Sequence, residues 1–289
     1  MPDPISNPAS GAAAAAAPAL APAEKHKRPE LSNAARTMWP TFVMAAIVAG
    51  IIAVNWYLSL THPVRAWVLT MFLLAALFLF LGTVISRRPL GILVGSRNLM
   101  SLSRFQIVAW SLVILSAFLT IAFRRALGGA DKPLDIAMDP YLWALMGIST
   151  ASLVGTPLIL QNKASQKADD SQVKAAGEAL GEDANAIKQN SDGKLYANPD
   201  IWDARVTDMF EGDEVGNTAY IDIAKVQMFM FTMISIVVYC FVIYSSIGGN
   251  AKTLALPALS QGMIALLGIS HAGYLGSKTA DHTPTPPKG

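Results

Sequence analysis

Long apolar runs separated by short polar segments dominate this sequence. Six of the runs are long enough for an α-helix to cross a bilayer, because about 30 Å of hydrocarbon takes about 20 mostly apolar residues. The runs span Thr41–Leu60, Arg65–Ile85, Arg104–Phe123, Met138–Leu160, Val226–Ile247 and Leu256–Ser277. The pattern therefore predicts an all-α polytopic membrane protein with six transmembrane helices.

One apolar, glycine-studded phrase occurs twice. "ALMGISTASLVG" at 144–155 returns as "ALLGISHAGYLG" at 265–276, which is 121 positions later. In the same frame, residues 91–157 align without a gap with residues 212–278. The identical pairs include Gly91/Gly212, Gly95/Gly216, Gln106/Gln227, Gly128/Gly249 and Gly155/Gly276. Matching glycines and a glutamine mark backbone and packing constraints, so we infer two duplicated helix hairpins of the same topology, related by an axis along the membrane normal.

The duplication divides the chain into segments. The first two helices have no counterpart and form a separate hairpin. We expect a disordered Ala/Pro-rich cytoplasmic arm (1–37), an N-terminal transmembrane hairpin (38–88), repeat unit 1 (89–161), a cytoplasmic loop with helical segments (162–211), repeat unit 2 (212–278) and a Pro-rich cytoplasmic tail (279–289). In the loop, "PDIWDARVTDMF" at 199–210 predicts an amphipathic helix. Its acids favour docking onto protein over anionic lipid.

Composition and charge agree with a bilayer environment. The mean hydropathy is +0.40, and charged residues make up 15% of the chain, against about 25% in soluble domains. Seventeen of the 22 Lys and Arg residues lie in the segments assigned to one side. Cytoplasmic loops carry this excess, so we expect both termini to be cytoplasmic, and we take the membrane to be a bacterial inner (plasma) membrane. The single cysteine, Cys240, permits no internal disulfide.

Small residues recur at a spacing of four in both copies of the phrase. They are Gly147, Ala151 and Gly155 in the first copy, and Gly268, Ala272 and Gly276 in the second. This spacing stacks small residues on one helix face and lets another backbone approach closely, which favours helix association in lipid. We therefore expect a helix-packing seam, formed between the two copies or between subunits of a homo-oligomer.

The polar residues within the helices suggest several roles. Arg104 and Lys225 occupy equivalent positions near helix ends, where a cation can reach the headgroups at little free-energy cost. They are expected to be interfacial anchors, and the alternative is an anion or lipid-headgroup site formed with the glycine-rich loops. The candidates for polar contacts or for lining a pore are Gln106, Gln227, Ser149, Ser270 and His271. For His271, a hydrogen bond to a neighbouring helix is favoured over a proton relay or haem ligation.

The loops that lead into the two repeats carry opposite charge. Arg87 and Arg88 lie in the first, whereas Asp208 and several other acids lie in the second. Because Arg87 is the repeat counterpart of Asp208, we predict that these loops pair across the pseudo-twofold axis.

Catalytic and ligand-binding signatures are missing from the sequence. It contains no "HExxH", "GxxxxGK[ST]", "GxSxG" or "TVGYG", and no Asp or Glu lies in a predicted helix core, which argues against an ion-coupled carrier. We expect no enzymatic activity, no cofactor, no metal site and no nucleic-acid partner. The expected partners are the lipid bilayer, further copies of the chain and a cytoplasmic protein. The favoured function is a self-assembling membrane anchor or scaffold, and the alternative is a passive ion or small-solute channel between the repeats or subunits.

Overall fold

The computed structural model describes residues 33–280 and residue 282, and every regular element in this part is helical. The elements are α1 (Asn33–Leu58), α2 (Pro63–Ser86), η1 (Pro89–Leu93), α3 (Leu102–Leu127), α4 (Pro140–Ala164), α5 (Asp170–Leu180), α6 (Ala184–Asn190), η2 (Ile201–Asp203), η3 (Val206–Met209), α7 (Ile223–Ser246) and α8 (Gln261–Thr279). The all-helical class is therefore confirmed.

Five helices in the described residues are long and apolar enough to cross a membrane. They are α1 from Met38 onward, α2, α3, α4 and α7. The remaining predicted span overlaps α8, which packs against α4 and α7 but is not among the helices long and apolar enough to cross a membrane. α8 begins at Gln261 rather than at Leu256, because Ser260 caps its N-terminus and Pro257 lies just before the cap.

Side-chain caps set the first residue of four of these helices. Ser101 accepts a hydrogen bond from the backbone N–H of Arg104 at the start of α3, and Asp222 accepts from two N–H groups at the start of α7. Asp139 caps α4 and Ser260 caps α8 in the same way. Such caps satisfy backbone donors that the first helical turn leaves without partners.

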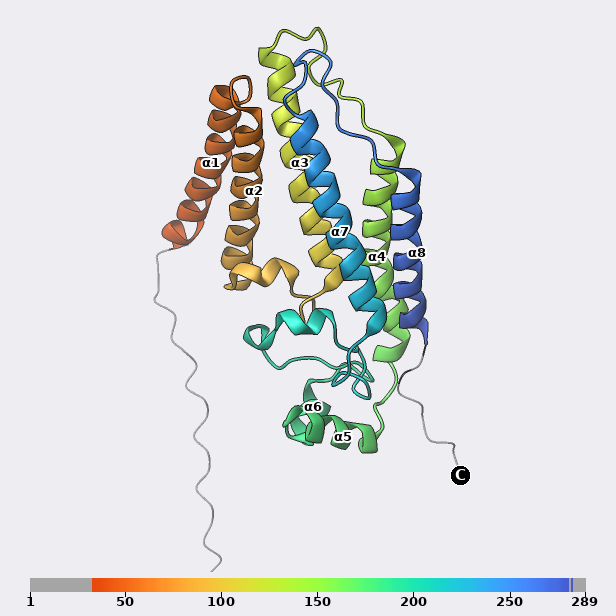
Figure 1. The fold of residues 1–289 in the computed structure, drawn as a ribbon. Helices are drawn as coiled ribbons and strands as arrows, with labels where there is room; N and C mark the ends of the chain where they lie inside the picture. The colour runs from red at the N-terminus through yellow and green to blue at the C-terminus, as the bar shows by residue number, and fades with distance from the viewer. Residues whose placement is uncertain (1–32, 281, 283–289) are drawn as a thin grey trace, which may run out of the picture. The chain divides into compact units, whose positions relative to one another are not determined.

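The helices α3, α4, α7 and α8 pack around a common apolar core. α3 contacts α4 and α7, and α8 contacts α4 and α7, while α2 packs on α3. Figure 1 shows α3 and α7 running in one direction and α4 and α8 in the other. Large side chains fill the centre, among them Trp110, Tyr239 and Leu267, with Ile121 and Leu145 near them. We call these four helices the bundle.

A close backbone approach folds the chain back after α2. A Cβ atom at Gly82 would lie 2.3 Å from the carbonyl oxygen of Pro89, and one at Gly91 would lie 2.4 Å from Cβ of Ser86. Only glycine fits at such distances, so α2 and η1 can pack tightly. The chain then enters residues 87–101, which we call the leading loop of α3.

Residues 165–222, between α4 and α7, form what we call the polar module. The helices α5 and α6 make a hairpin over a small core of Val173, Ala176, Ile187, Tyr196 and Val215. The prediction of an amphipathic helix at 199–210 is wrong, because this segment forms the two short 3-10 helices η2 and η3. Asp200 and Asp203 form a capping box at the start of η2, which is a single turn. Figure 1 shows the module at the end of the bundle where α3 and α7 begin.

The opposite end of the bundle is fastened by Arg124 of α3. Its Nη1 donates to the carbonyl of Ser59 at 2.5 Å, and its Nη2 donates to the carbonyl of Gly249 at 2.9 Å. The neighbouring Arg125 donates to the carbonyl of Leu254 at 3.2 Å. These bonds connect the α1–α2 turn with the connection between α7 and α8.

The predicted arm and tail are only partly within the described residues. Residues 1–32 of the arm lie outside them, whereas residues 33–37 belong to α1. This start differs from the expected end of the arm, because "NAART" contains no Pro or Gly to stop a helix. In the tail, residue 281 and residues 283–289 lie outside the described part.

Candidate functional site

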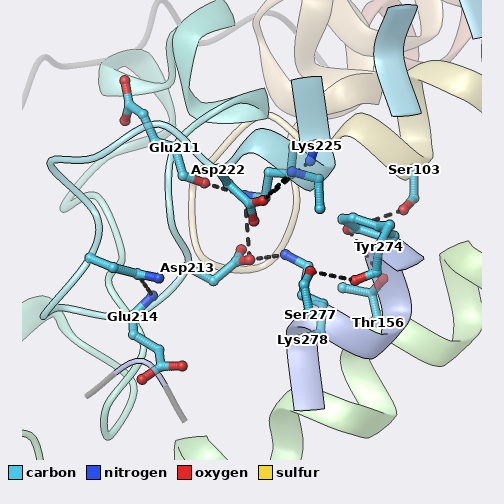
Figure 2. A network of polar contacts seen from close by, with 12 residues as sticks. Ser103, Thr156, Glu211, Asp213, Glu214, Asp222, Lys225, Tyr274, Ser277 and Lys278 are labelled. Carbon is cyan, nitrogen blue, oxygen red and sulfur yellow. Dashed lines mark hydrogen bonds and ion pairs between the residues drawn. The ribbon is translucent and has the colours of Figure 1, made fainter. Parts of the chain in front are cut away.

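The polar module meets the bundle at one shared carboxylate, that of Asp213. Its Oδ1 lies 2.8 Å from Nη2 of Arg97, and its Oδ2 lies 3.3 Å from Nζ of Lys225. Lys278 forms a further ion pair with Oδ2, which Figure 2 shows together with Lys225. The cations come from the leading loop of α3, the first turn of α7 and the last turn of α8. We call Asp213 and these cations the Asp213 cluster.

The contribution of the Asp213 cluster to stability depends on the burial of its side chains. The side chains of Lys225 and Lys278 are 6% and 3% exposed, and that of Asp213 is 14% exposed. Removing one partner of a buried ion pair destabilises by about 3–5 kcal/mol, because the other charge stays buried without compensation. Three cations share this one carboxylate, and the charges of Asp222, Glu211 and Asp208 also act on Lys225.

Backbone carbonyls supply further acceptors to the cluster. Nη1 of Arg97 donates to the carbonyls of Tyr196 and Asp213, at 3.0 Å each. Nζ of Lys225 donates to the carbonyl of Glu211. Burial lowers the pKa of Arg97 below its usual value, but a guanidinium starts so high that it remains charged at neutral pH. The planar guanidinium thus bonds two backbone groups and a carboxylate at once.

A second buried ion pair lies beside the first. Nζ of Lys163, at the end of α4, is 2.6 Å from Oε1 of Glu214, and these side chains are 9% and 1% exposed. Lys163 also donates to the carbonyl of Ala280, and the backbone N–H of His282 donates to the same Oε1 at 3.2 Å. The module is therefore connected to α4 and to the segment after α8.

The hydroxyl of Tyr274 joins three helices next to the cluster (Figure 2). It accepts hydrogen bonds from Ser103 of α3 at 3.5 Å and from Thr156 of α4 at 3.3 Å. Nζ of Lys278 lies 4.8 Å from the centre of the Tyr274 ring, a cation–π arrangement. Polar contacts thus continue from the module into the bundle.

The leading loop of α3 binds the module through hydrogen bonds from side chains to backbone carbonyls. Arg88 donates to the carbonyls of Ile201 and Ala204, at 2.5 Å each. Asn98 and Asn198 exchange reciprocal bonds, each amide donating to the other's backbone carbonyl at 3.0 Å. The basic and acidic loops therefore meet.

The particular pairing predicted for these loops is not the one that forms. Arg87 is exposed and has φ +58°, and it ends α2 in a left-handed conformation. Oδ2 of Asp208 accepts instead from the backbone N–H groups of Met100 and Arg205, at 3.0 and 2.9 Å. Burial raises the pKa of Asp208, and these two hydrogen bonds oppose the increase. The arginines of this loop that contact the polar module are therefore Arg88 and Arg97, and not Arg87.

The small-residue positions divide into an inner and an outer set. A Cβ at Gly155 would lie 3.6 Å from a methyl carbon of Leu275, and one at Gly268 would lie 3.8 Å from Ile148, so these two glycines lie between α4 and α8. A Cβ atom at Gly147 or at Gly276 would meet no described atom within 4 Å. Ala151 and Ala272 are exposed as well.

Residues that the predicted repeat aligns have different surroundings. The side chain of Gln106 is buried, and its Nε2 donates to Oγ1 of Thr232 on α7 at 2.5 Å. Gln227 is exposed. Likewise Arg104 is exposed and donates to the carbonyl of Ile92 at 3.5 Å, whereas Lys225 is buried in the Asp213 cluster.

The proposed pore-lining residues are buried side chains of α4 and α8. Ser149, Ser270 and His271 are 2%, 4% and 3% exposed. Nδ1 of His271 lies 2.8 Å from the carbonyl of Leu267 in the same helix. Within residues 33–280 and 282, no hydrogen-bond partner is found for Nε2 of His271 or for the two serine hydroxyls.

Sequence reasoning missed the residues at the centre of the site. Arg97, Asp213, Tyr274 and Lys278 were not singled out, although Arg97 and Asp213 lie in the two glycine-containing loops that the repeat aligns. Lys and Asp residues near the predicted helix ends are a signal for buried ion pairs there. This signal does not tell which residues pair with which.

The part of the chain that the structure describes contains no group of three or more His, Cys, Asp or Glu side chains arranged to hold a metal ion. Searches with protein-family models, among curated proteins and among solved structures find no significant match to the chain.

Proposed function

We propose that the chain is a membrane-embedded scaffold that holds the polar module at the cytoplasmic surface for a soluble partner protein. The observation that carries this proposal is the attachment of the module, which has its own small core and is fixed to the bundle by the buried Asp213 cluster and by Lys163 with Glu214. A module attached in this way presents its outer surface in one orientation, which a flexible loop would not do.

The outer surface of the module has the chemistry of a protein-binding site. Trp202 and Val206, on η2 and η3, are 61% and 54% exposed. Asp200 and Asp203 lie beside them and are also exposed. Exposed aromatic and apolar side chains are typical of interface centres, so the partner that fits has an apolar depression with a basic rim.

The proposed topology has six crossings, with α8 as the sixth and both termini on the cytoplasmic side of a bacterial inner membrane. Arg124 and Arg125 are two of the five cations assigned to the other side, and they donate to backbone carbonyls there. Because the protein itself binds these two cations, they count less against the orientation that the distribution of Lys and Arg favours.

Three features of the fold support the proposed internal duplication. The caps Ser101 and Asp222, and likewise Asp139 and Ser260, are separated by 121 positions, which is the shift that aligns the repeats. The contacts among the four bundle helices are unchanged when α3 is exchanged with α7 and α4 with α8. In addition, Gly91 and its repeat counterpart, Gly212, are both sites where a Cβ would collide.

Self-assembly is the proposed role of the outer small residues. Gly147, Ala151, Ala272 and Gly276 are exposed on α4 and α8. Small residues on lipid-facing helix surfaces allow a second backbone to approach closely, so this face suits contact with another copy of the chain.

The scaffold proposal is tested by site-specific crosslinking in intact cells. A photoreactive amino acid is placed at Trp202 or at Val206, and at Lys252 as a control in the connection between α7 and α8. We expect both module positions to crosslink to the same soluble protein and Lys252 not to. Crosslinks only to lipid or to the chain itself would refute the scaffold.

The channel is retained as a second candidate because of Ser149, Ser270 and His271, whose buried polar atoms lack partners in the described residues. Buried polar groups in membrane proteins often line ion or solute pathways. Purified protein in liposomes should then pass ions or small solutes, and His271→Ala should change the flux. A membrane that stays tight across salts and voltages excludes the channel and leaves the scaffold proposal standing.

A further inference from the structure

A cavity of about 750 Å³ lies beside the Asp213 cluster, between the start of α3 and the second half of α4. This volume falls within the range of about 300–1,000 Å³ that is typical of ligand sites. One wall is apolar and is formed by membrane-spanning helices, including Phe78 of α2, Val108 of α3 and Leu153 and Leu158 of α4.

The other end of the cavity is polar and charged. Arg97, Lys225 and Lys278 line it together with Asp213. Further along the lining are Arg104, Asp192 and Asp208. Cations therefore outnumber carboxylates, and Asp208 is already engaged with two backbone N–H groups.

The cations at the polar end of the cavity can accept an additional anion. Taking an ammonium or guanidinium out of water is unfavourable unless a counter-charge and hydrogen-bond acceptors replace the solvent. Within the described residues, Asp213 is the carboxylate that pairs with all three of Arg97, Lys225 and Lys278, and the other acceptors of Arg97 and Lys225 are neutral backbone carbonyls. A phosphate group has the charge and the acceptor oxygens to serve several cations at once.

The cavity is also accessible from the membrane side. Leu158 lines it and is 64% exposed, on a helix that is long and apolar enough to span the bilayer. Lys225 and Lys278, at the polar end, lie in the first turn of α7 and the last turn of α8. Charged and apolar ends are thus aligned with the headgroup and hydrocarbon regions of a membrane.

We infer that this cavity binds an anionic amphiphile, with its phosphate headgroup at Arg97, Lys225 and Lys278 and its acyl chain along the apolar wall of α3 and α4. The inference is independent of the proposed scaffold function, because a lipid site requires no soluble partner.

The test is lipid retention by the full-length protein, measured by native mass spectrometry after delipidation. The detergent-solubilised protein is offered phosphatidylglycerol, phosphatidylcholine, or glycerol phosphate as a soluble headgroup. We expect one phosphatidylglycerol per chain, preferred over phosphatidylcholine by at least about tenfold, and no comparable binding of glycerol phosphate.

A matched pair of variants locates the site. Leu153→Trp fills the apolar part of the cavity without touching the ion pairs, whereas Val154→Trp adds the same bulk at the adjacent α4 position, which is 55% exposed and does not line the cavity. Retention should be lost in L153W and kept in V154W, with both variants showing unchanged helix content. Equal retention of both lipids, equal retention by both variants, or glycerol phosphate binding as tightly as the lipid would overturn the inference.

Discussion

Replacing Asp213 with Asn should release the polar module from the bundle. The substitution keeps the size of the side chain but removes the one carboxylate that Arg97, Lys225 and Lys278 share. Three buried cations are then left without their common counter-charge. We expect the module to open locally while the membrane helices stay folded, because the apolar core of the bundle does not include Asp213.

The expected size follows from burial. Breaking a buried ion pair in this way costs about 3–5 kcal/mol. Each 1.4 kcal/mol changes an equilibrium tenfold, so the open population should rise roughly a hundred- to a few-thousand-fold. The module contains Lys174 and Arg205 as trypsin sites, and cleavage tracks the open population when opening and closing are fast. Initial cleavage rates in inverted membrane vesicles therefore report the effect directly.

Asp170→Asn is the matched control, since it is the same substitution in the same module. Asp170 pairs with Lys188 at 2.5 Å, but these side chains are 81% and 61% exposed. Surface pairs contribute about 0.2–1 kcal/mol, so D170N should raise cleavage no more than about fivefold. If D213N and D170N are cleaved at similar rates, the argument that the Asp213 cluster holds the module is refuted.

Three further predictions concern pH, an interhelical hydrogen bond and the small residues. Burial raises the pKa of Asp208 above its usual 3.8, so the folded state keeps this proton to higher pH than the unfolded chain does. The resulting stability is present at low pH and is lost as pH rises through the raised pKa. Relative to wild type, Asp208→Asn should gain thermal stability as pH increases from about 4 to 7, and a constant difference would contradict this. Thr232→Val leaves a buried amide on α3 without its partner and should cost about 0.6–1.7 kcal/mol in detergent unfolding, whereas Gln227→Leu, at an exposed position, should have little effect; equal losses would show that the hydrogen bond is not what matters. Gly155→Leu should lower the thermal unfolding midpoint by separating α4 from α8. Gly147→Leu should leave that midpoint unchanged and reduce the oligomer mass measured by light scattering, and an unchanged mass would remove this face as the site of self-assembly.

Hydropathy was sufficient to locate the five described helices that are long and apolar enough to cross a membrane. Apolar runs of this length have few alternatives to a helix, because a membrane offers no partner for unpaired backbone groups. Ser101 and Asp222 precede the apolar runs and then cap α3 and α7. The amphipathic pattern at 199–210 did not predict the structure correctly because tertiary contacts override it. Arg88 donates to the carbonyls of Ile201 and Ala204, which lie at the two ends of η2.

The candidate site was harder to predict because its partners are distant in sequence. Arg97 and Asp213 are far apart along the chain and meet only after the module folds onto the bundle. The internal alignment also suggested equal roles for Gln106 and Gln227, yet one is buried and the other exposed. The alignment compares positions along the chain, whereas the polar module between α4 and α7 contacts Lys225 near one of the aligned positions and not Arg104 near the other.

The bonds made by Arg124 bear on the order in which the chain is built. Its guanidinium finds one acceptor at Ser59, which is synthesised earlier, and another at Gly249, which is synthesised much later. During translation, the acceptor at Gly249 is therefore missing until the second half of the protein has been inserted. A truncated product would keep a poorly satisfied cation at this end of the bundle, a defect of the kind that quality-control proteases recognise.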